Sequence, residues 1–121
     1  MSGTTILILS GDAVAAALVG ALVETLGYLV KFVGLPDAVD DSMRRLRPRI
    51  CLVDCVDSAL CNSAILGRAQ MRGISVVIFG TSDALDRVGA LVSEHAIDTL
   101  RLPADPSVID DTLRRALKKA G

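Results

Sequence analysis

Asp54 is the residue of this sequence best placed to do chemistry. It closes the apolar run Ile50-Cys51-Leu52-Val53, which has the composition of a buried β-strand. A carboxylate at the carboxyl end of such a strand can accept a transferred group or bind a cation, or it can cap the loop that follows. The sequence therefore predicts either a reactive, switching site at Asp54 or a structural cap.

Further residues stand after the ends of the other apolar runs and are candidates for the same site. They are Ser10, Gly11 and Asp12 after the first run, Gly80, Thr81 and Ser82 after the fourth, and Leu102 and Pro103 after the fifth. In an open parallel sheet the functional crevice lies outside the carboxyl ends of the strands. We therefore expect these segments to surround Asp54.

Cysteine and histidine offer little alternative chemistry. The three cysteines, Cys51, Cys55 and Cys61, are an odd number, and the single histidine, His95, is far from them in sequence. Cys51 and Cys55 have the strand parity opposite to Asp54, so we expect them in the packing layers. A metal site would lack a fourth ligand, and no nucleophile, base and orienting group can be assembled, so we expect no enzyme.

Short apolar runs alternate with helical patterns, which is typical of a parallel sheet with crossover helices. The expected strands are residues 5–9, 28–33, 50–54, 75–79 and 99–102. Five units of this kind form a single domain over residues 1–121, with helices on both faces of the sheet.

The expected helices have recognisable ends. Asp12 caps the first, which carries Val14, Leu18 and Leu22 on one face and stops at Gly27. The second runs from Pro36 to Leu46, and the third covers about 59–71. The fourth begins at Ser82 or Asp83, with Leu85, Val88 and Val92 facing inward. The fifth begins at Pro106.

Composition and charge exclude several classes of partner. The 121 residues carry a net charge of −1 and only 2% aromatics, which disfavours nucleic acid and anionic membranes. Arginines 44, 45, 47 and 49 cluster before one strand, where they complement the carboxyl end of a helix. Charged residues interrupt the most apolar stretch, so we expect no membrane span, and no secretory signal is visible. The expected location is the cytoplasm.

The ordered combination of these features resembles the receiver domain of two-component response regulators. It rests on the spacing of the five units, on "RPRICLVDC" with Asp54 at the phosphoacceptor position, and on Pro103 after the fifth strand. The resemblance implies an α/β, flavodoxin-like (βα)5 sandwich with a parallel sheet of order 2-1-3-4-5. It also implies a role in two-component signalling.

Other key positions depart from the family. In the family, two carboxylates hold Mg²⁺ together with the acceptor, and Ser10 and Gly11 stand at their positions. Gly80 stands where the family has a Thr or Ser after the fourth strand, and Leu102 stands where it has a Lys before the proline. The aromatic switch position falls on Thr99. A charge-assisted hydrogen bond contributes ~1.5–3 kcal/mol, so these losses weaken recognition of a phosphoryl group.

Two residues are left as displaced helpers. Asp12 lies one position late and, with Asp54, is a weak candidate ligand for Mg²⁺, whereas Thr81 replaces the lost hydroxyl only if its loop shifts. We therefore expect no firmly bound cofactor. The favoured hypothesis is a pseudo-receiver that acts through protein contacts, and the alternative is a working phosphoacceptor with weakened Mg²⁺ binding.

The resemblance also implies partners and surfaces. A histidine kinase or an output domain is the expected partner, and homodimers are expected to use the fourth helix, the fifth strand and the fifth helix. A different class of function is an anion or nucleotide site at the amides of Ser10-Gly11. Against it, the chain has no Walker lysine motif and no G-x-G-x-x-G fingerprint, and Asp12 would repel a phosphate.

Overall fold

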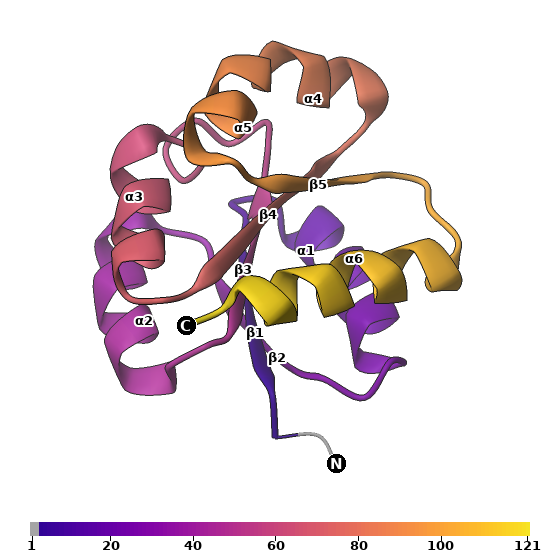
Figure 1. Ribbon diagram of the computed structural model, residues 1–121, viewed down its shortest axis with the longest axis horizontal. Coiled ribbons are helices and arrows are strands. Elements are labelled where there is room, and N and C mark those ends of the chain that lie inside the picture. Colours follow the sequence, from indigo (N-terminus) through magenta and orange to yellow (C-terminus); the bar gives the residue numbers. More distant parts are fainter. Residues whose placement is uncertain (1–2) are drawn as a thin grey trace.

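The computed structural model describes residues 3–121, which form one five-stranded parallel sheet between helices (Figure 1). The strand order is β2-β1-β3-β4-β5, as the flavodoxin-like prediction requires. The strands are β1 (Thr5–Leu9), β2 (Leu29–Val33), β3 (Ile50–Asp54), β4 (Ser75–Gly80) and β5 (Asp98–Arg101). The predicted strands are confirmed to within one residue at each end.

Each face of the sheet has its own apolar core. The helices α1 (Ala13–Glu24) and α6 (Pro106–Lys119) cover one face, and α2 (Val39–Leu46) and α3 (Ser63–Met71) cover the other. Short helices α4 (Ser82–Arg87) and α5 (Gly89–His95) lie near β5, where they close the second core beyond α3 (Figure 1). Both faces of β3 and β4 are therefore buried, which explains their nearly continuous apolar sequences.

Alternation along β3 directs neighbouring side chains to opposite cores. Ile50 and Leu52 join the α1/α6 core, whereas Cys51, Val53 and Cys55 join the α2/α3 core. The cysteines therefore pack as small hydrophobic side chains, as the sequence predicts. Asp54 ends the strand with the parity of Leu52.

The helical predictions need four corrections. The expected fourth helix is interrupted at Val88, whose ψ of 19° leaves the helical region, and it divides into α4 and α5. The cap of α4 is Thr81 rather than Ser82 or Asp83. α3 begins at Ser63, later than expected, because Asn62 caps it. A short 3₁₀ turn over Pro36–Ala38 precedes α2.

The predicted apolar face of α1 points away from the sheet. Val14 and Leu18 are 70% and 64% exposed, whereas Ala16, Val19 and Val23 are buried. Of the helices in residues 3–121, none is long and apolar enough to cross a membrane.

Candidate functional site

The Asp54 carboxylate lies at the carboxyl end of β3, is 5% exposed, and is held by two hydrogen bonds. Ser10 Oγ donates to Asp54 Oδ2 (2.8 Å), and the Val56 N–H donates to Asp54 Oδ1 (3.2 Å). Ser10 Oγ in turn accepts from the Asp12 N–H (3.1 Å). Because β1 and β3 are neighbours in the sheet, Ser10 comes to Asp54 across a sequence separation of 44 residues.

Both displaced helpers of the sequence prediction serve as helix caps. Asp12 Oδ1 accepts from the Val14 and Ala15 N–H groups (3.0 and 3.2 Å) at the start of α1. Thr81 Oγ1 accepts from the Ala84 N–H (3.3 Å) at the start of α4. These bonds satisfy amides that would otherwise lack partners within the helix, so each side chain already has a structural role.

Asp57 is a further carboxylate of the crevice that sequence reasoning missed. Its Oδ2 accepts from the Gly11 N–H (2.8 Å), and a Cβ at Gly11 would lie only 2.6 Å from this oxygen. Asp57 therefore occupies the space of a side chain at position 11. The signal available in the sequence was a second carboxylate three residues after Asp54, on the loop that must pass the crevice.

The amide of Gly11 is consequently not free to bind an anion. It donates to a carboxylate of the same chain, which is itself an anion. The structure thus argues against the nucleotide site considered for Ser10-Gly11.

Cys55 fills the space above Gly80. A Cβ at Gly80 would overlap Cys55 Sγ, although the other neighbours of that position lie at ordinary contact distances. A Thr or Ser at position 80 therefore requires Cys55 to move. Burial, followed by the charge of Asp54, raises the pKa of the Cys55 thiol, which keeps it protonated and unreactive near neutral pH.

Leu102, which follows β5, packs toward α1. The half-buried Leu102 packs against the α1/α6 core, and its N–H donates to the Gly80 carbonyl (2.8 Å). The Leu102-Pro103 peptide bond is cis. Leu102 and Pro103 also line a cavity of about 440 Å³ with Leu18 and Leu22 of α1. The position matched to the family's lysine therefore contributes apolar surface toward α1.

A second polar cluster, which sequence reasoning also missed, links α3 to α5. His95 Nε2 lies 3.3 Å from Ser63 Oγ, and His95 Nδ1 lies 3.0 Å from Gln70 Oε1. The Gln70 amide also donates to the His95 carbonyl (2.8 Å). Gln70 also lines a cavity of about 220 Å³ together with Ala96 and Asp98. The three hydrogen-bonded contacts of His95 hold α3 and α5 together beside this cavity.

The ligands at the crevice do not fit the Mg²⁺ that receiver domains hold. Within residues 3–121, no three His, Cys, Asp or Glu side chains are grouped to bind a metal ion. Each carboxylate has a hydrogen-bonded role, since Asp54 pairs with Ser10, Asp57 with Gly11, and Asp12 with α1. A hard dication needs oxygen ligands gathered about one point, and this arrangement disperses them.

Structural comparison relates the chain to receiver domains. A sensor protein from Polaromonas sp. JS666 matches with a TM-score of 0.80 at 18% identity, over 98% of this chain and 99% of that one. A response regulator receiver domain protein from Clostridium thermocellum matches with a TM-score of 0.78 at 17% identity, over 96% and 95%.

A protein assigned to pilus assembly (cpaE) in Burkholderia thailandensis matches with a TM-score of 0.74 at 26% identity, over 95% of this chain and 98% of that one. Comparison of the sequence with protein-family models and with curated protein sequences gives no match. The chain has the fold of response regulator receiver domains, as the sequence resemblance implied.

Proposed function

We propose that this chain is a pseudo-receiver: a receiver-type signalling domain that acts through protein contacts, with phosphorylation of Asp54 absent or vestigial. The observation that carries the proposal is the hydrogen bonding of the Asp54 carboxylate, whose two oxygens are engaged by Ser10 and by the Val56 N–H. The partner is a signalling protein, such as a histidine kinase or an output domain. On this proposal the chain is not an enzyme.

Phosphoryl transfer explains why this hydrogen bonding matters. An in-line transfer needs cations or donors that neutralise the developing charge on the phosphoryl oxygens. At this crevice, Leu102 stands at the position of the family's cation and Gly80 at that of its hydroxyl. The space beside Gly80 contains Cys55 Sγ, which is a weak donor. Asp54 therefore lacks groups that would stabilise a phosphorylated state.

Acyl phosphate treatment tests the proposal directly. With acetyl phosphate and millimolar Mg²⁺, we expect intact-mass spectrometry to show no stoichiometric gain of a phosphoryl group. The same Mg²⁺ should raise the unfolding temperature by no more than about 1–2 °C, because even a ligand present at its Kd adds only ~0.4 kcal/mol to stability. Stoichiometric, Mg²⁺-dependent modification of Asp54 would overturn the proposal.

A restored variant sharpens this test. Ser10→Asp together with Leu102→Lys returns one carboxylate and the cation to the crevice, so we expect this double variant to gain measurable phosphorylation. Ser93→Asp with Leu29→Lys makes the same changes of charge at exposed positions away from Leu102 and is the matched control. A gain in the control as well would show that the crevice is not the cause.

The alternative is a working phosphoacceptor, and Asp57 is the observation that favours it. This carboxylate lies in the same crevice and offers an anionic group beyond those that the sequence predicted. Under the alternative, Asp54→Asn abolishes modification and changes the signalling output. Under the pseudo-receiver proposal, the same substitution leaves the output unchanged.

A further inference from the structure

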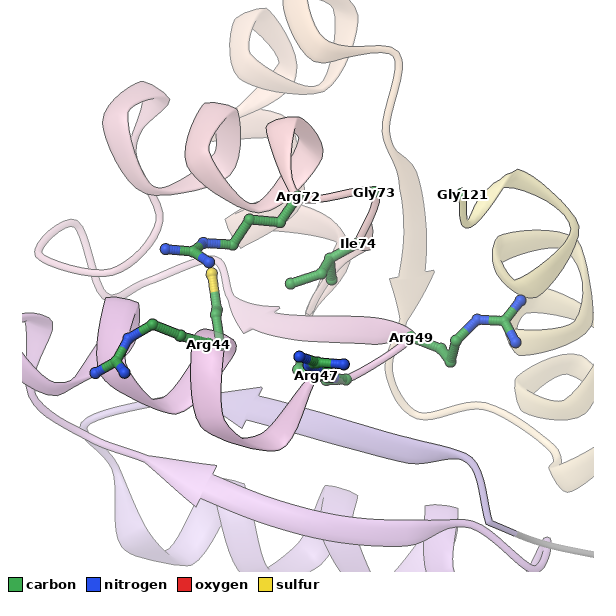
Figure 2. A pocket seen from close by; sticks show the side chains of 9 residues that line it. Arg44, Arg47, Arg49, Arg72, Gly73, Ile74 and Gly121 are labelled. Atoms are coloured by element: carbon green, nitrogen blue, oxygen red, sulfur yellow. The ribbon is translucent and has the colours of Figure 1, made fainter.

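An arginine-lined cavity lies at the amino end of the sheet, opposite the crevice of Asp54 (Figure 2). It has a volume of about 520 Å³ and lies between the end of α2, the end of α3 and the starts of β3 and β4. β3 is five residues long, so at ~3.3 Å per residue the cavity is more than ~13 Å from Asp54. This site is therefore separate from the one discussed above.

Arginines from two helix ends line the cavity. Figure 2 shows Arg44 and Arg72 extending toward the same side and Arg47 lying near the centre. Met43 and Ile74 also line the cavity. Arg49 turns the other way, toward α6, where its Nη2 lies 3.5 Å from the Leu117 carbonyl. Arg44, Arg47 and Arg72 are thus the arginines available to a ligand.

These positive charges are poorly neutralised by the chain. Arg44 pairs with Asp41, but among residues 3–121 no carboxylate lies within 4.0 Å of the Arg47 or Arg72 guanidinium groups. No acidic side chain lines the cavity, but Gly121 does, and the terminal carboxylate of this last residue adds one negative charge there. Both unpaired side chains are exposed, so an incoming anion reaches them without displacing a partner.

Helix dipoles explain part of this cluster but not all of it. The carboxyl ends of α2 and α3 each carry about −0.5 charge, so together they offset about one of the cationic charges. Two unpaired arginines, and a third that shares Asp41 with Arg45, exceed that amount. Four arginines line the cavity, and Asp41, the two helix ends and the Gly121 carboxylate offset about three of their charges, so the cavity keeps about one positive charge.

The backbone at Arg47 ends α2 and leads into β3. Its φ of 47° is in the left-handed region, where glycine or asparagine is the usual residue after a helix. Ala96 ends α5 in the same conformation, with a φ of 52°. The Arg47 side chain lines the cavity from this position.

We propose that this cavity binds a small molecule that carries a diphosphate or triphosphate group. The planar guanidinium groups of Arg47 and Arg72 match phosphate oxygens in two-point contacts, and Arg44 adds further charge. Met43 and Ile74 supply an apolar floor for the rest of the molecule. The volume is within the ~300–1,000 Å³ range of small-molecule sites.

Calorimetric titration of the full chain with inorganic triphosphate, ATP and GTP tests the proposal. We expect binding that weakens as the salt concentration rises, and a loss of about a hundredfold in affinity in the variant Arg47→Gln with Arg72→Gln, because each lost charge-assisted contact costs about tenfold or more. Tighter binding of ATP or GTP than of inorganic triphosphate assigns a nucleotide as the source. Equal binding assigns the phosphate chain alone. Both results support the site.

The matched control is Arg45→Gln with Arg115→Gln, which removes two arginines outside the cavity and keeps the same net charge as the test variant. An equal loss in this control would overturn the proposal, because binding would then depend on overall charge. Absence of binding to all three probes at millimolar concentration would also overturn it. Binding of an aspartate-rich peptide in place of the three probes would do so too, and would point to a protein partner.

Discussion

At the scale of single residues, side chains from the loop after β3 fill the space at two glycines near Asp54. Gly11 and Gly80 are the positions without a side chain, and in both cases a neighbour on the loop after β3 occupies the space. Asp57 lies over Gly11, and Cys55 lies over Gly80. A larger side chain at position 11 or 80 therefore requires a second change on that loop.

Gly80→Ala tests this packing. The added Cβ overlaps Cys55 Sγ, so we expect a loss of about 1–2 kcal/mol in the free energy of unfolding, measured by urea titration. Gly89→Ala is the control, because a Cβ there has open space around it, and we expect it to be neutral or stabilising.

A double variant that combines Gly80→Ala with Cys55→Ala should lack the overlap, because it removes the Cys55 sulfur. The cost of Gly80→Ala is then smaller in the Cys55→Ala background than in the native one. Equal costs in the two backgrounds would show that the sulfur is not what opposes a side chain at position 80.

At the scale of elements, α1 shows that hydrophobicity alone does not determine which side of an apolar helix is buried. Residues 13–23 contain no charged side chain, so hydrophobicity hardly distinguishes the sides of the helix. Size decides instead, because Gly20 allows the Phe32 ring of β2 to approach, and a Cβ at position 20 would lie 2.7 Å from it. The larger Val14 and Leu18 are left exposed.

Paired substitutions on α1 make this arrangement testable. We expect Leu18→Ala to change the free energy of unfolding by less than ~0.5 kcal/mol, since the side chain is 64% exposed. Val23→Ala should cost about 2 kcal/mol, because this side chain is fully buried in the α1/α6 core. A larger cost for Leu18→Ala than for Val23→Ala in urea titrations would contradict the observed orientation.

At the scale of the whole molecule, the sheet separates two kinds of surface. The carboxyl end presents neutralised or apolar groups around Asp54, and the amino end presents arginines. Between them, the two cores bury both faces of β3, including Cys51, which is 0% exposed. The interior of the sheet is therefore sensitive to any charge that develops there.

Alkaline pH should destabilise the fold through Cys51. Burial raises the pKa of this thiol from 9.0 to about 12, so in the unfolded chain it releases its proton at a lower pH than in the folded chain. The resulting stabilisation is complete below about pH 9 and is lost as the pH rises toward about 12.

Urea titrations of the native chain and of Cys51→Ala measure this effect. The native chain should be the more stable at about pH 8, and the difference between the two should narrow by about pH 10. A difference that does not vary with pH would contradict the assignment to Cys51.

The sequence by itself determined the five strands, most helix ends and the position of Asp54. These features depend on local periodicity and on capping residues that act within a few positions of one another. It also predicted that Ser10, Gly11, Gly80 and Leu102 come to the end of the sheet near Asp54, because parallel strands align their carboxyl ends.

Only the tertiary structure decided what those residues do. The bonds from Ser10 to Asp54 and from Gly11 to Asp57 join positions 44 and 46 residues apart, and no local pattern encodes such contacts. The same holds for the arginines of α2 and Arg72 after α3, which come together only because β3 and β4 are adjacent. Local sequence fixes which elements form, and packing among distant elements fixes which side chains meet.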